Sequence, residues 1–231
     1  MVKAIFNWSG GKDSALALTR ALECGEYEIV ALLTTVNRES GLSSMHNIPQ
    51  KVLMRQAESI GIPLYTVGLT PKGDMADYAE AMREAVLHFK EQGVSHFIFS
   101  DIYLHDVRQY RERQLSPYGI MVVEPLWGLS SHEIMEQFLA SGIECRIVTT
   151  DASVLGCEYI GRKIDRQLTD SLPSGVDVCG ENGEYHTVCL NAPCFSRRIS
   201  IQISKPFSRT YSIRNDDGST HDYTYWFSSL D

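Results

Sequence analysis

The chain has 231 residues, 43% hydrophobic and 22% charged, which is typical of a globular protein with a sizeable core. Its net charge of −8 disfavours nucleic acid as a partner, because like charges repel. No apolar run is long enough to span a bilayer, and the N-terminus does not resemble a signal peptide. We therefore expect a cytoplasmic protein that does not enter a membrane.

Apolar strand patterns alternate with helical patterns along the first 150 residues. The predicted strands are 3–8, 28–36, 63–69, 94–102, 120–127 and 144–151. The predicted helices are 13–25, 49–61, 75–93, 104–119 and 130–142. Continuously apolar strands that alternate with helices are typical of a parallel sheet covered on both faces. The sequence therefore predicts an α/β fold whose ligands bind at the carboxyl ends of the strands.

The pattern changes after residue 150. A short helical segment gives way to polar sequence, and residues 198–204 and 210–231 have β-strand character. The second of these stretches contains a turn signal at residues 215–219, which predicts a hairpin. We expect a smaller α+β region at the C-terminal end.

A polar segment rich in glycine connects the first predicted strand to the first helix. It consists of Ser9, Gly10, Gly11, Lys12, Asp13 and Ser14. Glycines let the backbone turn sharply and approach a ligand, and a helix N-terminus attracts anions such as phosphate. Hydroxyls and the lysine add donors and charge, while Asp13 is suited either to capping the helix or to holding Mg²⁺. The segment predicts a phosphate-binding loop that matches neither the Walker pattern nor G-x-G-x-x-G.

A second segment, residues 179–195, concentrates ionisable groups. Glu181, Glu184 and His186 lie around Asn182 and Gly183. Two carboxylates and an imidazole so close together suit binding magnesium, positioning an amine or accepting a proton. A polar surface turn is the alternative.

The first segment resembles the pyrophosphatase loop of the N-type ATP pyrophosphatases, which cleave ATP between the α and β phosphates. The resemblance implies their fold, the HUP-like or adenine nucleotide alpha hydrolase fold. Ammonia ligases and sulfur-inserting enzymes share this loop, so the loop alone does not select the reaction.

The second segment resembles the diphthine–ammonia ligase family, which carries C-G-E-x-G-E-[YF], then a threonine and a D/N-x-P-x-F segment. The matching residues are Cys179, Gly180, Glu181, Gly183, Glu184, Tyr185, Thr187, Pro193 and Phe195. Residues 99–102, Arg108 with Glu112, and residues 124–127 add to a resemblance that covers residues 2–199. Ser100 and Cys194 depart from it, since they stand where the family usually has glycine and leucine.

The resemblance implies an ATP- and Mg²⁺-dependent ligase that adenylates a carboxylate, transfers ammonia from ammonium, and releases AMP and pyrophosphate. In the family the carboxylate belongs to diphthine on elongation factor 2. Bacterial chains share the pattern without making diphthamide, so a related carboxylate is the alternative acceptor. We expect residues 1–128 to form the ATP-binding domain and residues 129–231 the substrate-binding region.

The resemblance also implies roles for individual residues. Catalysis is expected of Lys12, Asp13, Glu181, Glu184 and His186, with Glu184 deprotonating ammonium and Asp13 contacting Mg²⁺. Besides Ser9 to Ser14, the expected nucleotide contacts are Thr34, Thr35, Val36, Asn37, Met45, His46, Ser100 and Asp101. The expected substrate contacts are Arg108, Glu112, Glu181, Asn182, Gly183, Glu184, Tyr185 and Thr187.

Three other functions stay open. A tRNA sulfur transferase is disfavoured, since such enzymes usually carry C-x-x-C pairs and a basic face, and the six cysteines here form no C-x-x-C pair. A non-catalytic ATP- or AMP-binding protein would keep the loop without the chemistry. A ligase fed with ammonia from glutamine would need a partner protein. The sequence also leaves open whether the chain forms a homodimer.

Overall fold

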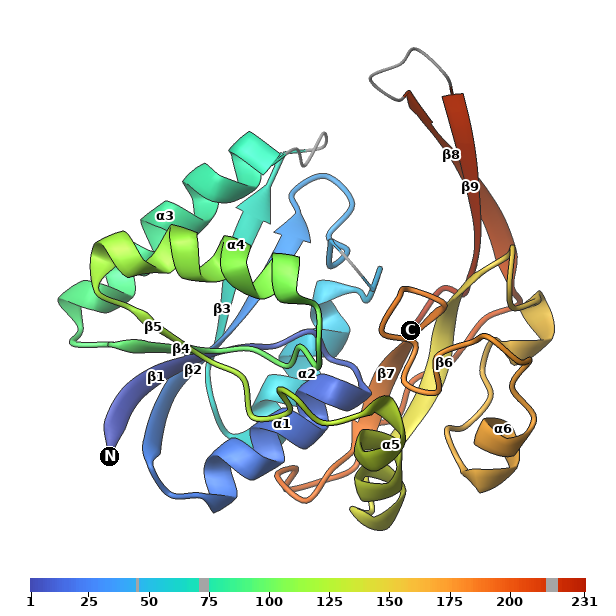
Figure 1. Ribbon diagram of the computed structural model, residues 1–231, viewed down its shortest axis with the longest axis horizontal. Coiled ribbons are helices and arrows are strands. Elements are labelled where there is room, and N and C mark those ends of the chain that lie inside the picture. Colours follow the sequence, from blue (N-terminus) through green and yellow to red (C-terminus); the bar gives the residue numbers. More distant parts are fainter. Residues whose placement is uncertain (45, 71–74, 215–219) are drawn as a thin grey trace.

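Two β-sheets organise the chain (Figure 1). The structure, a computed structural model, describes residues 1–44, 46–70, 75–214 and 220–231. The first sheet is parallel throughout, with the strand order β3-β2-β1-β4-β5. Its strands are β1 (Val2–Asn7), β2 (Tyr27–Asn37), β3 (Leu64–Leu69), β4 (His96–Ile98) and β5 (Met121–Val123).

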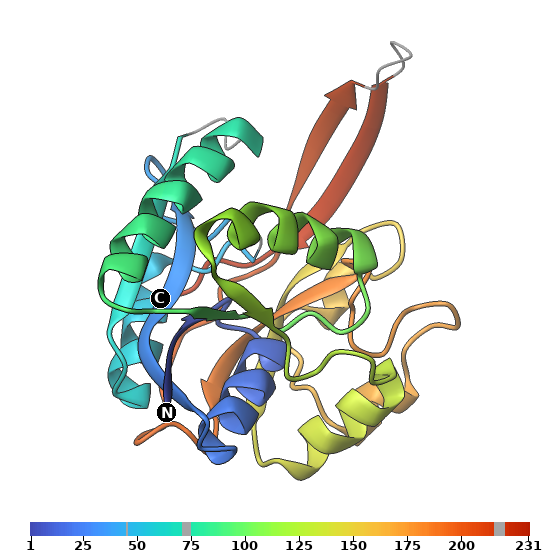
Figure 2. The same cartoon turned by 60° about the vertical axis from the view of Figure 1, so that its left-hand side comes forward.

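Helices cover both faces of this parallel sheet, α1 and α2 on one and α3 and α4 on the other (Figure 2). They are α1 (Lys12–Glu23), α2 (Gln50–Ile60), α3 (Met75–Glu91) and α4 (His105–Leu115), which continues into the 3₁₀ turn η1 (Ser116–Tyr118). Alternate strand residues serve the two faces: Ala4 and Phe6 pack in the core beneath α1, and Ile5 packs in the core beneath α3. The predicted α/β fold is confirmed.

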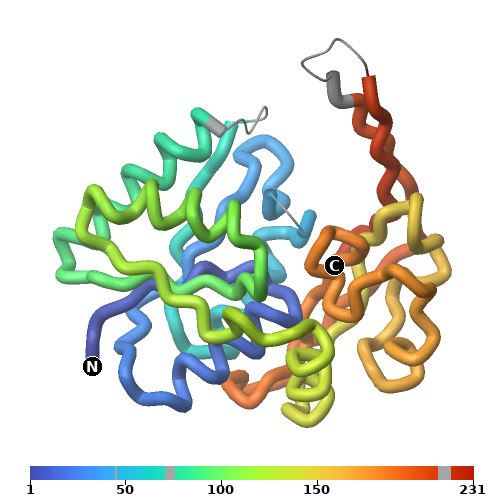
Figure 3. Tube along the Cα trace, in the orientation of Figure 1, coloured from blue at the N-terminus to red at the C-terminus, as the bar shows by residue number. Residues whose placement is uncertain are grey.

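The second sheet is antiparallel, with the strand order β7-β6-β9-β8. Its strands are β6 (Glu144–Asp151), β7 (Tyr185–Asn191), β8 (Phe207–Arg214) and β9 (Thr220–Phe227). The other elements of this part are α5 (Ser131–Ala140), the 3₁₀ turn η2 (Cys157–Tyr159) and α6 (Arg166–Asp170). The β8–β9 hairpin extends away from the rest of the molecule (Figure 3). The predicted smaller α+β region is therefore present.

Two details of the prediction need correction. Residues 144–151 form β6, which pairs antiparallel in the second sheet rather than extending the parallel one. The sequence of a strand does not specify the direction of its partners, and the partners of this strand, β7 and β9, come from distant parts of the chain. Residues 198–204 form no regular strand and contribute only the isolated bridge of Ile203 to Leu230. The predicted turn at 215–219 lies outside the described residues.

The edge strand β7 joins the two sheets by binding the loop that follows β1. The Cys189 amide donates to the Gly10 carbonyl at 2.7 Å, and the Lys12 amide donates to the Thr187 hydroxyl at 2.9 Å. Gln56, on α2, is completely buried at this junction. Its amide nitrogen donates to the carbonyls of Gly10 at 3.0 Å and Cys189 at 2.8 Å, and its oxygen accepts from the Trp8 indole at 2.8 Å.

We predict that Gln56→Ala lowers the free energy of unfolding by about 3 kcal/mol, because it leaves buried polar groups unpaired and opens a cavity. Urea denaturation measures this change. Gln109→Ala, at an exposed position on α4, is the matched control and should change stability by less than about 0.5 kcal/mol. Equal stabilities of the two variants would contradict the role of Gln56.

Candidate active site

The loop between β1 and α1 fits between its neighbours only because it contains glycine. Gly10 has a φ of +81°, and a Cβ there would lie 2.6 Å from Leu53 Cδ2 and 2.9 Å from Gln56 Oε1. A Cβ on Gly11 would lie 3.1 Å from the Thr187 carbonyl oxygen. The loop is therefore pressed against α2 on one side and β7 on the other.

Helix α1 begins with its backbone amides directed into this loop. Its N-cap residue is Gly11, which has no side chain with which to cap the helix. The Ser9 hydroxyl accepts from the Gly11 amide at 3.4 Å, and the Ser14 hydroxyl accepts from the Ser9 amide at 3.2 Å. Backbone amides, two hydroxyls and the positive end of the helix dipole together favour an anion.

Lys12 places a buried positive charge at the same point. Its ammonium, only 2% exposed, lies 2.6 Å from both carboxylate oxygens of Asp13. Burial lowers the pKa of Lys12, but Asp13, Cys179 and Tyr185 together outweigh burial and raise that pKa above its usual value. Lys12 is therefore charged at neutral pH. The capping role that was one of two predictions for Asp13 is wrong, because Asp13 lies inside the helix and pairs with Lys12.

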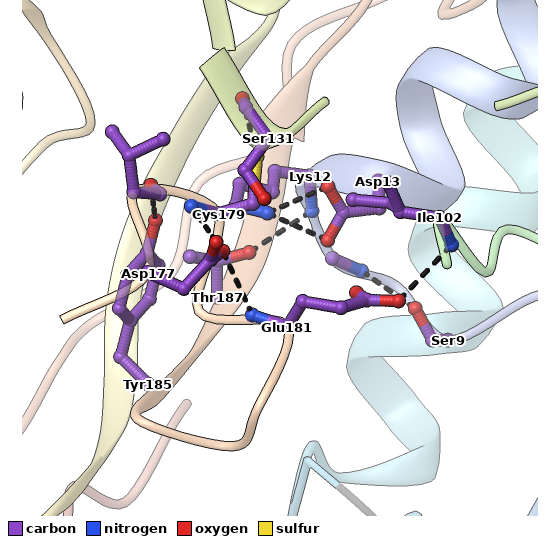
Figure 4. Close-up of polar contacts among 12 residues, drawn as sticks. Ser9, Lys12, Asp13, Ile102, Ser131, Asp177, Cys179, Glu181, Tyr185 and Thr187 are labelled. Carbon is purple, nitrogen blue, oxygen red and sulfur yellow. Dashed lines mark hydrogen bonds and ion pairs between the residues drawn. The ribbon is translucent and has the colours of Figure 1, made fainter. Parts of the chain in front are cut away.

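The second predicted segment folds into a loop held together by its own carboxylates (Figure 4). Asp177 Oδ1 accepts from the amides of Cys179 at 2.8 Å and Glu181 at 3.2 Å. The buried Glu184 accepts from the Asp177 amide at 2.9 Å and from the Asn182 amide and side chain at 3.0 and 3.1 Å. These contacts favour a positioning role for Glu184 over the base role expected from the sequence.

Glu181 reaches from this loop to Ile102, in the loop that follows β4, as Figure 4 shows. Its Oε1 accepts from the Ile102 amide at 3.0 Å. Burial raises the pKa of Glu181 to about 7, while the hydrogen bond from Ile102 opposes the shift. Glu181 is thus a half-buried carboxylate that gains and loses its proton near neutral pH.

Three other members of the segment, Tyr185, Gly183 and Thr187, have structural roles. The buried Tyr185 donates its hydroxyl to the Val178 carbonyl at 2.6 Å, which closes the loop, and its ring lies 5.8 Å from the Lys12 ammonium. Gly183, with a φ of +90°, supplies the tight turn between the two glutamates. The Thr187 hydroxyl, bound to the Lys12 amide, connects the two predicted motifs directly.

A pair of imidazoles lies against the phosphate loop. The rings of His46 and His186 meet edge to face with centroids 4.5 Å apart, and His46 Nδ1 is 3.2 Å from the Ser9 carbonyl oxygen. Burial lowers the pKa of both, and for His186 His46 and then Lys12 lower it further. Both rings are therefore neutral at pH 7. Met45, expected to be a nucleotide contact, lies outside the described residues.

The residues expected to flank the nucleoside at the end of β2 hold the next loop. Thr34 is buried, and Val36 forms an isolated bridge with Ser43. The Thr35 hydroxyl lies 2.5 Å from the Ser44 hydroxyl. The side-chain oxygen of Asn37 accepts from two amides of the following turn, at 2.9 and 3.0 Å.

The expected contacts after β4 form a network of alternating charges with α4. Asp101, next to Ser100, forms an ion pair with Arg111. Arg108 pairs with Glu112 at 3.0 Å and with Glu124 at 3.3 Å. The Glu124 side chain is fully buried, and burial raises its pKa. These ion pairs direct Asp101 toward Arg111 on α4. They direct Arg108, also on α4, toward Glu124 in the segment after β5.

Sequence reasoning missed residues that hold the site together: Gln56, Asp177, Arg111 and Glu124. For Gln56 the signal was present, because it is a polar residue on the apolar stripe of α2 that includes Val52, Leu53 and Ala57. Asp177 had no comparable signal, since acidic residues are common in turns.

The donor set fits a nucleoside triphosphate with magnesium. The glycine cradle, the α1 amides and Lys12 would hold phosphates. Within the described ranges, no group of three His, Cys, Asp or Glu side chains could hold a metal by itself. Mg²⁺ characteristically binds one or two carboxylates together with substrate phosphates, and Asp13, which pairs with Lys12 in this structure, is the carboxylate of the loop that could supply such a contact.

The strand order also indicates where the ligand binds. β1 and β4 are neighbours at the centre of the sheet, where the connections change direction. Asn7 donates to the Ile98 carbonyl at 3.1 Å across these two strand ends. Ligands of open parallel sheets bind at such a switch point. Fold and site together define a HUP-like nucleotide-binding protein with a phosphate loop after its first strand.

Comparison with known proteins identifies the family. The model of the diphthamide synthase N-terminal domain matches residues 2–121, and that of the diphthamide synthase C-terminal domain matches residues 130–216. The chain belongs to the diphthamide synthase family, so the predicted resemblance is confirmed.

Curated relatives carry the name diphthine–ammonia ligase. The protein from Bos taurus is 26% identical, over 85% of this chain and 82% of the relative, and that from Homo sapiens is 24% identical with the same coverage. The protein from Schizosaccharomyces pombe is 24% identical. The aligned part covers 84% of this chain and 35% of that longer relative. The expected enzyme class, a ligase, is confirmed by these relatives. Among the described residues no helix is both long and apolar enough to cross a membrane.

We predict that Gly10→Ala reduces pyrophosphate release about 100-fold, because the added methyl group displaces the phosphate loop. Gly61→Ala is the matched control: Gly61 has the same φ of +81° but nothing within 4 Å of the added Cβ. Both variants strain the backbone, so only the close contact distinguishes them. Pyrophosphate release at saturating ATP measures the difference. Similar losses in both variants would contradict the claim that the close contacts at Gly10 position the loop.

Proposed function

We propose that the protein is an ATP-dependent amide-forming ligase that adenylates a carboxylate and transfers ammonia to it, releasing AMP and pyrophosphate. The observation that carries this proposal is the contact between the two motifs: the Lys12 amide in the phosphate loop is bound by Thr187, three residues after Glu184. A further support is that Lys12 and Asp13 of this loop act electrostatically on Glu181, a carboxylate with a pKa of about 7. The named relatives support diphthine as the acceptor.

In this mechanism, the phosphate loop and Lys12 bind and orient the phosphates of ATP, and Lys12 stabilises the negative charge on the leaving pyrophosphate. The acceptor carboxylate attacks the α phosphate, forming an acyl adenylate and releasing pyrophosphate. Asp13 is placed to contact Mg²⁺, which neutralises phosphate charge when bound. We assign nucleotide binding to residues 1–128 and acceptor binding to residues 129–231.

Amide formation requires ammonia rather than ammonium, because only the neutral form has a lone pair. A base with a pKa near the working pH removes the proton efficiently. Glu181 has this property, and its hydrogen bond to the Ile102 amide fixes the carboxylate in place. We therefore assign the base role to Glu181, and to Glu184 the task of holding the loop in shape. Ammonia then attacks the acyl carbon, AMP leaves, and the neutral His46 and His186 exclude water nearby.

The remaining proposals concern partners and place of action. The acceptor would be elongation factor 2 carrying diphthine, or a related carboxylate in a bacterial cell. Free ammonium would supply nitrogen. The six cysteines are all free, which suits the reducing cytoplasm.

The experiment that tests this function is analysis of nucleotide products. The protein is incubated with ATP, Mg²⁺ and ammonium, with and without elongation factor 2 carrying diphthine. We expect AMP, pyrophosphate and the amide only in the complete mixture. AMP without amide would indicate hydrolysis of the adenylate in place of ammonia transfer, and ATP binding without AMP would refute diphthine as the acceptor and leave another carboxylate or a non-catalytic nucleotide-binding protein.

We predict that Glu181→Gln lowers the rate of amide formation about 100-fold and abolishes its dependence on pH around 7, because general bases contribute roughly that much. In the wild type the rate should rise as the pH increases through about 7, since Glu181 accepts a proton only when ionised. The measurement is the pH profile of the rate at a constant, saturating concentration of ammonium.

Glu184→Gln is the companion variant. It presents an amide nitrogen where the loop supplies donors, so we expect lower stability but an unchanged pH profile. If Glu184→Gln lost the pH dependence and Glu181→Gln kept it, the assignment of the base would be reversed.

A further inference from the structure

A groove of about 440 Å³ lies on the second sheet, lined among others by Arg146, Leu190 and Arg198. None of its lining residues belongs to the phosphate loop or to residues 177–187. The groove is therefore separate from the site described above.

Positive charge concentrates around this groove although the chain carries a net charge of −8. The Arg146 guanidinium donates to the neutral Gly161 carbonyl at 2.6 Å, and Arg55 donates to the Ser200 carbonyl. Arg198 pairs with Glu144 at 2.9 Å, but this guanidinium is half exposed and remains open to other anions. The guanidinium groups of Arg146 and Arg55 thus contact neutral carbonyl groups, and neither forms an ion pair within the part of the chain that the structure describes.

The pairing of Arg146 with Lys163 is the most telling feature. The two residues face each other directly in an isolated antiparallel bridge. Like charges directly opposite each other on neighbouring strands are destabilising. An anion bound between the two side chains would attract both of them and offset their mutual repulsion. The pair is therefore favourable only when the groove holds an anion.

We propose that this basic groove binds an acidic segment of a partner protein. The floor favours a peptide over a nucleic acid: Ile160, Leu190, Ile201 and Ile203 supply apolar contacts for side chains between the acidic ones. A nucleic-acid site would need a longer basic track with aromatic rings for the bases. The docking surface is independent of the proposed chemistry, because none of its residues belongs to the active site.

The test uses the full-length protein and a labelled oligoglutamate peptide, followed by fluorescence anisotropy at low and raised ionic strength. We expect binding that weakens with salt, and an oligoglutamine peptide of equal length should not bind. Lys163→Glu should weaken binding about tenfold, because reversing a charge replaces attraction by repulsion. Lys90→Glu, the same change at an exposed position on α3, should not affect it.

Lys163→Glu should also raise the melting temperature, because it replaces the repulsion of Arg146 by attraction. A variant that is more stable but binds less well cannot have lost binding by misfolding. Arg198→Glu is a second variant with the same expected loss of binding. Equal peptide binding by wild type and Lys163→Glu, or tighter binding of a uridine oligonucleotide of equal charge, would overturn the proposal.

Discussion

The hydrogen bond from the Cys189 amide to the Gly10 carbonyl is the contact on which the rest of the site depends. An edge strand offers unpaired backbone groups, and proteins usually cover them. Here β7 uses its free edge to bind the phosphate loop. Gln56, on α2, donates to the carbonyls of both Gly10 and Cys189 and so strengthens the same contact. One interaction therefore covers the edge of the second sheet and fixes the loop of the first.

This junction explains why the two halves of the chain belong together. Buried residues from both sheets form one continuous core, with Phe6 and Leu18 on one side and Val188 and Leu190 on the other. The loop has φ +81° at Gly10, a conformation that glycine readily adopts, but its position is determined by β7 and α2. Without the second sheet, the Lys12 amide and the Gly10 carbonyl would lose partners, so the phosphate loop would be less well ordered.

The sequence predicted what local patterns encode. Gly10 and Gly11 at a strand-to-helix turn, together with Lys12, identified the phosphate loop, and apolar periodicity identified the helices and strands. Packing between distant residues could not be predicted in this way. The two glutamates of the second motif have the same side-chain chemistry and each follows a glycine, yet Glu184 accepts three hydrogen bonds within its loop while Glu181 reaches the Ile102 amide, after β4. Only the folded chain distinguishes the residue that shapes the loop from the one suited to proton transfer.

Burial gives the charged groups of the site opposite properties. Lys12 keeps its charge in a buried position because Asp13 lies 2.6 Å away, whereas at Glu181 burial outweighs the Ile102 amide and the Lys12 charge, and the pKa of Glu181 rises to about 7. A carboxylate of ordinary pKa would be a weaker base, and one with a much higher pKa would be protonated at neutral pH. The site thus requires a close acidic partner for Lys12, and it requires that Glu181 has no equally strong basic partner. Asp177 and Glu184 meet that need by satisfying the amides of the loop, so that Glu181 is directed away from them toward the strand ends where the nucleotide would bind.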